Sequence, residues 1–137
     1  MKQLKKMRDR AFINDCLREL RPLVATGKKI VLGEVARKVL TGAESSYYVS
    51  FDTAYRRIGP LLRGKGPRGG TLTMTQMLYR DLALHVGRTM ERNPDMTIVD
   101  ALTRVLEFGR ASRHYISYQH ALRLLRTLVR TNYELVE

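Results

Sequence analysis

The sequence predicts an all-α protein made of two related three-helix units, which we expect to pack as a pseudo-twofold internal repeat. Three observations support this fold class. Apolar residues recur at helical spacing in successive segments of the chain. Residues that favour helix starts precede several of these segments. A twelve-residue segment of the first half also returns in the second half, and a repeat at a fixed offset indicates a repeated structural unit.

The repeated segment covers residues 47–58 and returns 67 positions later as residues 114–125. In each copy, residues that favour extended backbone precede a serine, and a helical pattern with arginine on its open side follows. Serine is a preferred N-cap because its oxygen accepts a hydrogen bond from a free backbone N–H of the first turn. Each copy therefore predicts a short extended piece leading into a capped helix. Four pairs are identical: Tyr48/Tyr115, Ser50/Ser117, Ala54/Ala121 and Arg56/Arg123.

The first helix is expected to follow or include a basic stretch at residues 2–10. Pro22 should end or kink this helix, because proline lacks a backbone donor and clashes with the preceding turn. Gly27 then suits a left-handed stop. The spacing places Cys16 toward the core, where cysteine behaves as a small apolar residue. The apolar positions of this helix are Ala11, Ile13, Cys16, Leu17 and Leu20.

The second and third helices are expected over residues 32–40 and 51–62, with a loop at residues 41–46 between them. The pair Gly59-Pro60 favours an end of the regular part near Ile58, because both residues disfavour a helix interior. The core side of the third helix is predicted to carry Phe51, Ala54, Tyr55, Ile58 and Leu62.

A basic, glycine-rich segment at residues 63–72 indicates a linker between the two units. The units are therefore expected at residues 1–62 and 73–137. A unit of this size buries little apolar surface by itself, so we expect the two units to share one core.

The second unit should open with a capping box, because Thr73 is followed three residues later by Gln76. The helix that begins there should stop at Asn93-Pro94, and Thr97 starts the next helix with a similar cap. That helix is expected to carry Ala101, Leu102, Val105, Leu106 and Phe108, and the last helix to run from Tyr118 toward Tyr133.

The strongest compositional feature is the charge: 25 Lys and Arg residues against 13 Asp and Glu residues, a net charge of +12. Residues 1–70 hold 16 basic and 6 acidic groups, a net +10, and residues 71–137 hold 9 and 7, a net +2. A strongly positive field attracts polyanions such as nucleic acid. The alternative is a basic protein whose charge serves only solubility.

Several classes of function are disfavoured. The sequence has no apolar run long enough to cross a membrane and no secretory signal at its start, so we expect no membrane partner. Its single cysteine favours a reducing, intracellular setting. The three histidines lack metal-ligand spacing, and the glycines of the linker lack the phosphate-binding loop pattern. We therefore expect no metal, no cofactor and no enzymatic activity.

The segments Glu34–Val39 and Val49–Ile58 together resemble a helix-turn-helix DNA-binding domain. The resemblance covers residues 32–62 and, more loosely, residues 98–130. It implies a trihelical unit in which the second of the two helices of the helix-turn-helix lies in the major groove. The sequence departs from the family in its turn, which is only about three or four residues there, whereas residues 41–50 and 109–117 separate the helices here.

This resemblance implies a set of exposed residues that contact nucleic acid. In the first unit they are Asp52, Thr53, Arg56 and Arg57, and in the second Gln119, His120 and Arg123, extended by Arg126 and Arg130. The linker adds Arg63, Lys65 and Arg68, which are free to reach a groove. The alternative is a solvated basic helix face. Tyr47, Tyr48 and Tyr115 could stack on unpaired bases, but core packing is the favoured interpretation.

The sequence thus predicts non-enzymatic nucleic-acid binding, with duplex DNA as the favoured partner and a role in transcription regulation or DNA architecture. We expect a cytoplasmic protein, associated with the nucleoid if it binds DNA. The alternatives are a helical interaction module for an acidic protein partner and an RNA-binding protein. The oligomeric state stays open.

Overall fold

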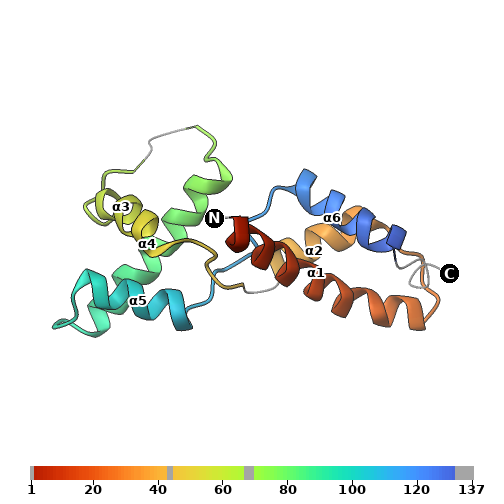
Figure 1. Ribbon diagram of the computed structural model, residues 1–137, viewed down its shortest axis with the longest axis horizontal. Helices are drawn as coiled ribbons and strands as arrows, with labels where there is room; N and C mark the ends of the chain where they lie inside the picture. The colour runs from red at the N-terminus through yellow and green to blue at the C-terminus, as the bar shows by residue number, and fades with distance from the viewer. Residues whose placement is uncertain (1, 43–44, 67–69, 132–137) are drawn as a thin grey trace. The chain divides into compact units, whose positions relative to one another are not determined.

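The computed structural model describes residues 2–42, 45–66 and 70–131, and within them the protein is all-α, as predicted (Figure 1). All of the regular structure in these ranges is helical apart from isolated bridge residues. The helices are α1 (Lys2–Ala25), α2 (Leu32–Gly42), α3 (Phe51–Leu62), α4 (Met74–Arg92), α5 (Ile98–Phe108) and α6 (Tyr118–Thr131).

The helices group into two compact units that do not follow the order of the chain. The inner unit is Ser46–Ala111 and contains α3, α4 and α5; the terminal unit is Lys2–Ser45 together with the chain from Ser112 onward and contains α1, α2 and α6. In each unit the three helices pack against one another. The grouping therefore differs from the expected division into residues 1–62 and 73–137.

The difference lies in the third helix of each repeat. Helix α3 packs on α4 and α5, and α6 packs on α1 and α2, so each unit combines two helices of one repeat with the third helix of the other. The third helices carry equivalent docking residues, Ala54/Ala121 and Ile58/Leu125, so the repeat pattern alone does not show on which pair of helices each one packs. The long segments before Ser50 and Ser117 give each third helix the reach for this exchange.

The core of the terminal unit is built from one stripe on each of its helices. Cys16 is fully buried, as the spacing predicted, and Phe12, which lies outside the predicted apolar set, is fully buried as well. The sequence pattern missed Phe12 because Ala11 and Ile13, on either side of it, are also apolar. The buried core residues are Phe12, Cys16, Leu20, Val35, Ala36, Val39, Leu40, Ile116, Ala121 and Leu125.

The inner unit buries equivalent positions. Cys16 and Leu20 of α1 correspond to buried Leu82 and Val86 of α4, each 66 positions later. In the third helices, the buried pairs are Ala54/Ala121 and Ile58/Leu125, each 67 positions apart. The repeat therefore preserves the residues at which the third helix docks. The inner core also includes Tyr47, Tyr79, Ala83, Ala101, Leu102 and Val105.

The predicted helix starts are confirmed. The Ser50 Oγ accepts a hydrogen bond from the backbone N–H of Thr53 at 3.3 Å. The Ser117 Oγ accepts one from the N–H of His120 at 3.2 Å. Thr73 and Gln76 form the complete capping box, with bonds of 3.1 and 2.9 Å. The Thr97 side chain caps α5.

Neither proline ends its helix, so an end at Pro22, one of the two outcomes expected there, and a stop near Ile58 are wrong, whereas the expected range 51–62 of the third helix is confirmed. Helix α1 continues through Pro22 to Ala25, and α3 continues through Pro60 to Leu62. The missing proline donor costs a helical bond, but Leu23, directly after Pro22, packs against the terminal core and offsets this loss.

Both of these helices end in the same closing motif, one turn beyond the proline. The N–H of Gly27 donates to the carbonyl of Val24, and the N–H of Lys28 donates to that of Leu23, each at 3.2 Å. This is a Schellman motif, which needs a left-handed residue, and Gly27 has a φ of 67°. Gly64, with a φ of 77°, closes α3 with the same pair of bonds, through Leu61 and Pro60.

Three smaller expectations are also corrected. Tyr55, expected in the core, is 45% exposed, because the buried stripe of α3 is Ala54 and Ile58. Phe108, also expected in the core, is the last residue of α5 and is 75% exposed. Thr41 and the following glycine belong to α2 instead of a loop, and the Thr41 hydroxyl donates back to the carbonyl of Arg37 at 2.9 Å.

The grouping of helices predicts which fragments fold. Residues 46–111 contain every helix of the inner unit together with its own buried residues. In contrast to the shared core expected from the sequence, this fragment should therefore unfold alone in one cooperative thermal transition. Residues 1–66 contain α3 without α4 and α5, so this fragment should lack a cooperative transition. Circular dichroism melts at low concentration test both fragments. A sharp transition of a monomeric 1–66 fragment would contradict the exchange of the third helices.

The caps predict the effect of two serine substitutions. Ser50→Ala and Ser117→Ala should each lower the free energy of unfolding by about 1 kcal/mol, because each leaves a backbone donor of the first turn without its partner. The matched variants Ser50→Gly and Ser117→Gly should lose only a few tenths of this amount. Urea denaturation measures the difference. Alanine variants as stable as the parent would remove the caps as a source of stability.

Candidate nucleic-acid interface

The outer face of α6 carries a row of exposed polar side chains. Gln119, Arg123, Arg126 and Arg130 follow one another at spacings of four, three and four residues, so they share one face of the helix. All four side chains are exposed. None of the three arginines forms an ion pair with a carboxylate in the ranges that the structure describes. The opposite side of α6 buries Ala121 and Leu125, so core packing fixes which face points outward.

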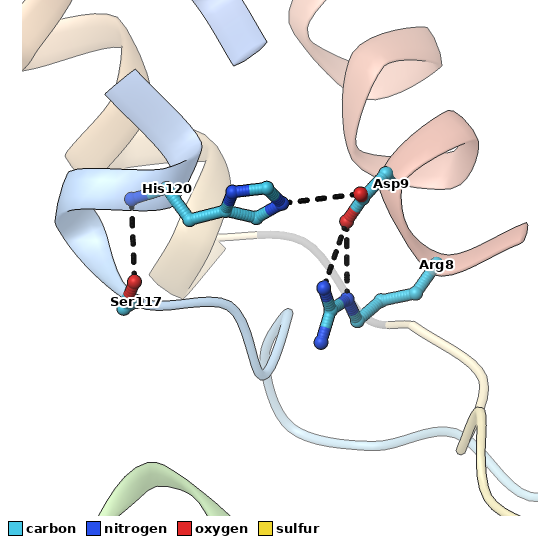
Figure 2. Close-up of polar contacts among 4 residues, drawn as sticks. All are labelled: Arg8, Asp9, Ser117 and His120. Atoms are coloured by element: carbon cyan, nitrogen blue, oxygen red, sulfur yellow. Dashed lines mark hydrogen bonds and ion pairs between the residues drawn. The ribbon is translucent and has the colours of Figure 1, made fainter. Parts of the chain in front are cut away.

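His120 was predicted to join this face, but its side chain contacts the terminal unit itself. Its Nε2 lies 3.1 Å from Oδ2 of Asp9 on α1. The Oδ1 of Asp9 accepts two hydrogen bonds from Arg8, at 3.1 Å from Nε and 3.0 Å from Nη2. Figure 2 shows this chain of contacts, which joins the beginning of α1 to the first turn of α6. His120 thus orients α6 in addition to any contact with a ligand.

The same region does not form a nucleophile and base. Ser117 lies beside His120, but its Oγ accepts a hydrogen bond from the backbone N–H of His120 and contacts no imidazole nitrogen by any interaction that the structure describes (Figure 2). A nucleophilic serine requires its hydroxyl to donate to a base. Ser117 is therefore positioned as a helix cap.

His114 is a buried polar residue that the sequence did not identify as important. It is 1% exposed, and its Nε2 lies 2.7 Å from Oδ2 of Asp15 on α1. Its backbone N–H donates to the carbonyl of Leu40 at 3.0 Å, and its ring meets Phe12 edge to face. The signal in the sequence is its place in the repeat, because it occupies the position of Tyr47, which is also buried and polar.

The predicted residues of the first repeat lie in the inner unit, in the first turn and the middle of α3. Arg56 is exposed. The guanidinium of Arg57 lies over the ring of Tyr79, 5.3 Å from its centre. Burial raises the pKa of Tyr79, and the nearby charge of Arg57 partly offsets this rise. Thr53 contributes its backbone N–H to the cap at Ser50.

The linker residues follow the end of α3. Arg63 is the C-cap of this helix and is exposed, and Lys65 lies in the turn after it and is also exposed. Arg68 lies outside the described residues. The structure thus divides the predicted set between two units: Gln119, His120, Arg123, Arg126 and Arg130 in the terminal unit, and Thr53, Arg56, Arg57, Arg63 and Lys65 in the inner unit.

The exchange of third helices also redistributes the charge. By sequence, the terminal unit holds 15 basic and 7 acidic residues, a net +8, and the inner unit holds 10 and 6, a net +4. The halves of the chain differ more strongly, +10 against +2. The arginines of α6 belong to the same unit as the lysines of α1 and α2. The terminal unit therefore carries more net positive charge than the inner unit and contributes more to the positive field.

The one cysteine of the chain, Cys16, is part of the core of the terminal unit. Cys16 is buried, and this burial, together with the nearby carboxylates of Asp15 and Glu19, raises the pKa of its thiol to about 12. Such a thiol is a poor nucleophile.

No group of three or more His, Cys, Asp or Glu side chains is arranged to bind a metal ion in the described ranges. No helix in the same ranges has the length and apolar character to span a membrane.

The chain was compared with protein-family models, with curated proteins and with solved structures, and none of these comparisons gives a match.

The environment of Cys16 predicts slow thiol chemistry in the native protein. At pH 8, raising the pKa from 9.0 to about 12 lowers the thiolate population by a factor of ~1000. Dithionitrobenzoate should therefore react with the native protein at least ~100-fold more slowly than with the urea-unfolded chain. Rapid reaction under native conditions would show that the thiol is open to solvent.

Proposed function

We propose that this chain is a non-enzymatic nucleic-acid-binding protein, with duplex DNA as its partner and a regulatory or architectural role. The observation that carries the proposal is the outer face of α6, where three exposed arginines and one glutamine lie in a row with no partner carboxylate among the described residues. Like charges at these spacings on one helix face repel one another by about 0.2–0.5 kcal/mol per pair, and an anionic ligand bound along the row relieves this repulsion.

The row has the dimensions of a groove-binding helix. From Gln119 to Arg130 the helix rises roughly 16 Å, at about 1.5 Å per residue. This length covers about five base pairs at ~3.4 Å per step. Arginine can donate two hydrogen bonds to guanine, glutamine can bond adenine, and both can bond phosphate. A helix that presents these residues on one side combines base contacts with phosphate contacts.

The helix-turn-helix resemblance is retained in a modified form. In the terminal unit, α6 packs on both α2 and α1. The proposed recognition helix is therefore supported by a second helix from the other repeat, and the long segment at residues 109–117 does not have to act as a tight turn. The pseudo-twofold packing of the two units, the site in the cytoplasm or at the nucleoid, and the role in transcription regulation remain predictions of the same proposal.

Salt dependence is the first test of this function. Affinity for a 20-base-pair duplex should fall at least ~10-fold between 50 and 200 mM salt, because each neutralised phosphate releases a counterion. The same titration with single-stranded DNA, RNA and an acidic peptide ranks the alternative partners. Tighter binding to the peptide than to any nucleic acid would favour the protein-interaction function instead.

Two triple variants with the same loss of charge locate the interface. Arg123→Gln, Arg126→Gln and Arg130→Gln together should lower duplex affinity, reduce the salt slope by about two to three units and change the preference among sequences. Arg63→Gln, Lys65→Gln and Arg68→Gln together should reduce the salt slope by a similar amount and leave sequence preference unchanged. Fluorescence anisotropy at several salt concentrations measures both effects.

The two variants also separate the possible outcomes. Equal loss of affinity without any change of preference would assign α6 to phosphate contacts alone. Parent-like binding of the α6 variant at every salt concentration would overturn the assignment of α6 as the interface. Thermal melts of both variants serve as the control for folding, because all of the described side chains that are replaced are exposed.

A further inference from the structure

The inner unit contains a small pocket between α4 and α5, with a volume of about 250 Å³. It is separate from the α6 face, which belongs to the terminal unit. Figure 1 shows α4 and α5 side by side in the inner unit. The residues that give the pocket its chemistry are His85, Thr89, Arg92 and Asn93 from α4 and its C-cap, and Arg104 and Phe108 from α5.

Two guanidinium groups line this pocket without an opposing charge. Arg92 and Arg104 both contribute to the wall, and no Asp or Glu does so among the described residues. Neither arginine forms an ion pair in the described part of the chain. Two cations that share one hollow repel each other unless an anion lies between them, so the pocket is suited to a group with at least one negative charge.

The remaining polar groups of the pocket are held in place. The Thr89 hydroxyl donates to the carbonyl of His85 at 2.9 Å, and Asn93 Nδ2 donates to the carbonyl of Thr89 at 2.8 Å. The Nδ1 of His85 lies 3.4 Å from the hydroxyl of the buried Tyr47. These bonds fix the α4 side of the pocket before any ligand arrives.

Gly109 allows the opposite side to approach closely. A Cβ atom at this position would lie 2.6 Å from the carbonyl oxygen of Val105 and 2.9 Å from Cε1 of His85. A side chain cannot be accommodated there without moving the backbone of α5 or the imidazole. The absence of a side chain therefore lets the end of α5 lie against His85.

Phe108 presents an exposed aromatic ring beside the two cations. It lines the pocket and is 75% exposed, the most exposed large apolar side chain of the described chain. Leaving such a ring in water is unfavourable. An aromatic face next to a cationic pocket matches a nucleotide, whose phosphate needs the cations and whose base stacks on aromatic rings. The pocket is smaller than those that enclose whole drug-sized ligands, about 300 Å³ and more, so the base lies outside, on Phe108.

We propose that this pocket binds one nucleotide unit, with the phosphate held by Arg92 and Arg104 and the base stacked on Phe108. The unit can be a free nucleoside monophosphate or an unpaired position of a nucleic-acid strand, because both carry an anionic phosphate and a base. The site does not depend on duplex binding by α6, since none of its residues belongs to that face.

The experiment uses the full-length chain with three probes: thymidine monophosphate, a twelve-residue oligothymidylate and a twelve-unit abasic strand of the same charge. Phe108→Ala should weaken binding of the oligothymidylate by ~5-fold or more, since stacking on one base corresponds to about that factor at its lower limit. It should leave binding of the abasic strand unchanged. Arg104→Gln should weaken binding of both strands.

Matched controls come from the same helices. Val99→Ala removes another exposed apolar side chain of α5, and Arg88→Gln removes another exposed arginine of α4, and neither residue lines this pocket. Both controls should bind all probes like the parent. As a second measurement, thymidine monophosphate should shift the backbone amide resonances of His85 and Gly109 in the parent, and the shifts should be lost in Arg104→Gln.

The outcomes separate the two sources of the ligand. If only the oligothymidylate responds to Phe108→Ala, the pocket takes an unpaired position of a strand; if thymidine monophosphate shifts the two resonances, it takes the free nucleotide. If the pocket variants match the controls with all three probes, the pocket proposal is wrong, whatever the duplex result. If instead the α6 triple variant binds duplex like the parent while the pocket variants lose binding, α6 is not the duplex interface and the pocket stands.

Discussion

The fold depends on the burial of one short apolar stripe on each third helix. Ala121 and Leu125 of α6 fill the groove of α1 and α2, and Ala54 and Ile58 of α3 fill the groove of α4 and α5. A pair of helices alone would leave its apolar residues in water, and burying them contributes roughly 25 cal/mol for each Å² removed from solvent. Each repeat therefore obtains its third layer from the other repeat.

The same docking decides where the charge of α6 points. Because Ala121 and Leu125 must face the core, the residues on the opposite side of the helix face water, and these include the three arginines of the α6 face. The Asp9–His120 contact at the first turn holds the helix in this orientation from a second point. Packing and electrostatics are thus coupled in α6: the buried side sets the direction of the exposed side.

Local features of this protein could be predicted from the sequence, and long-range ones could not. The caps at Ser50, Thr73 and Ser117 depend on residues within one turn, so the pattern identifies them correctly. The core position of Cys16 follows from helical spacing alone. The continuation of α1 through Pro22 was not expected, because contacts such as that of Leu23 with the terminal core are not displayed by the sequence.

The exchange of the third helices is ambiguous in the sequence for a physical reason. The two repeats carry the same docking residues, Ala54/Ala121 and Ile58/Leu125, so the pattern fits both a helix packed on its own repeat and a helix packed on the other. Contacts such as Asp9–His120 and Asp15–His114 join residues about 100 positions apart, and no local rule connects them. The sequence predicts the candidate interface as a set of residues, but it does not predict their division between two units.

The exchange also sets an order for folding during synthesis. The inner unit is complete once Ala111 has been made, but α1 and α2, made first, cannot bury their stripes until α6 exists. Translation from Gly42 to the end of α6 takes roughly 5 to 20 s at about 5–20 residues per second. Through this interval the partner helix is missing for Val35, Val39 and the apolar side of α1. The inner unit therefore folds while only the first segment of the terminal unit has been made, and the terminal unit is completed last.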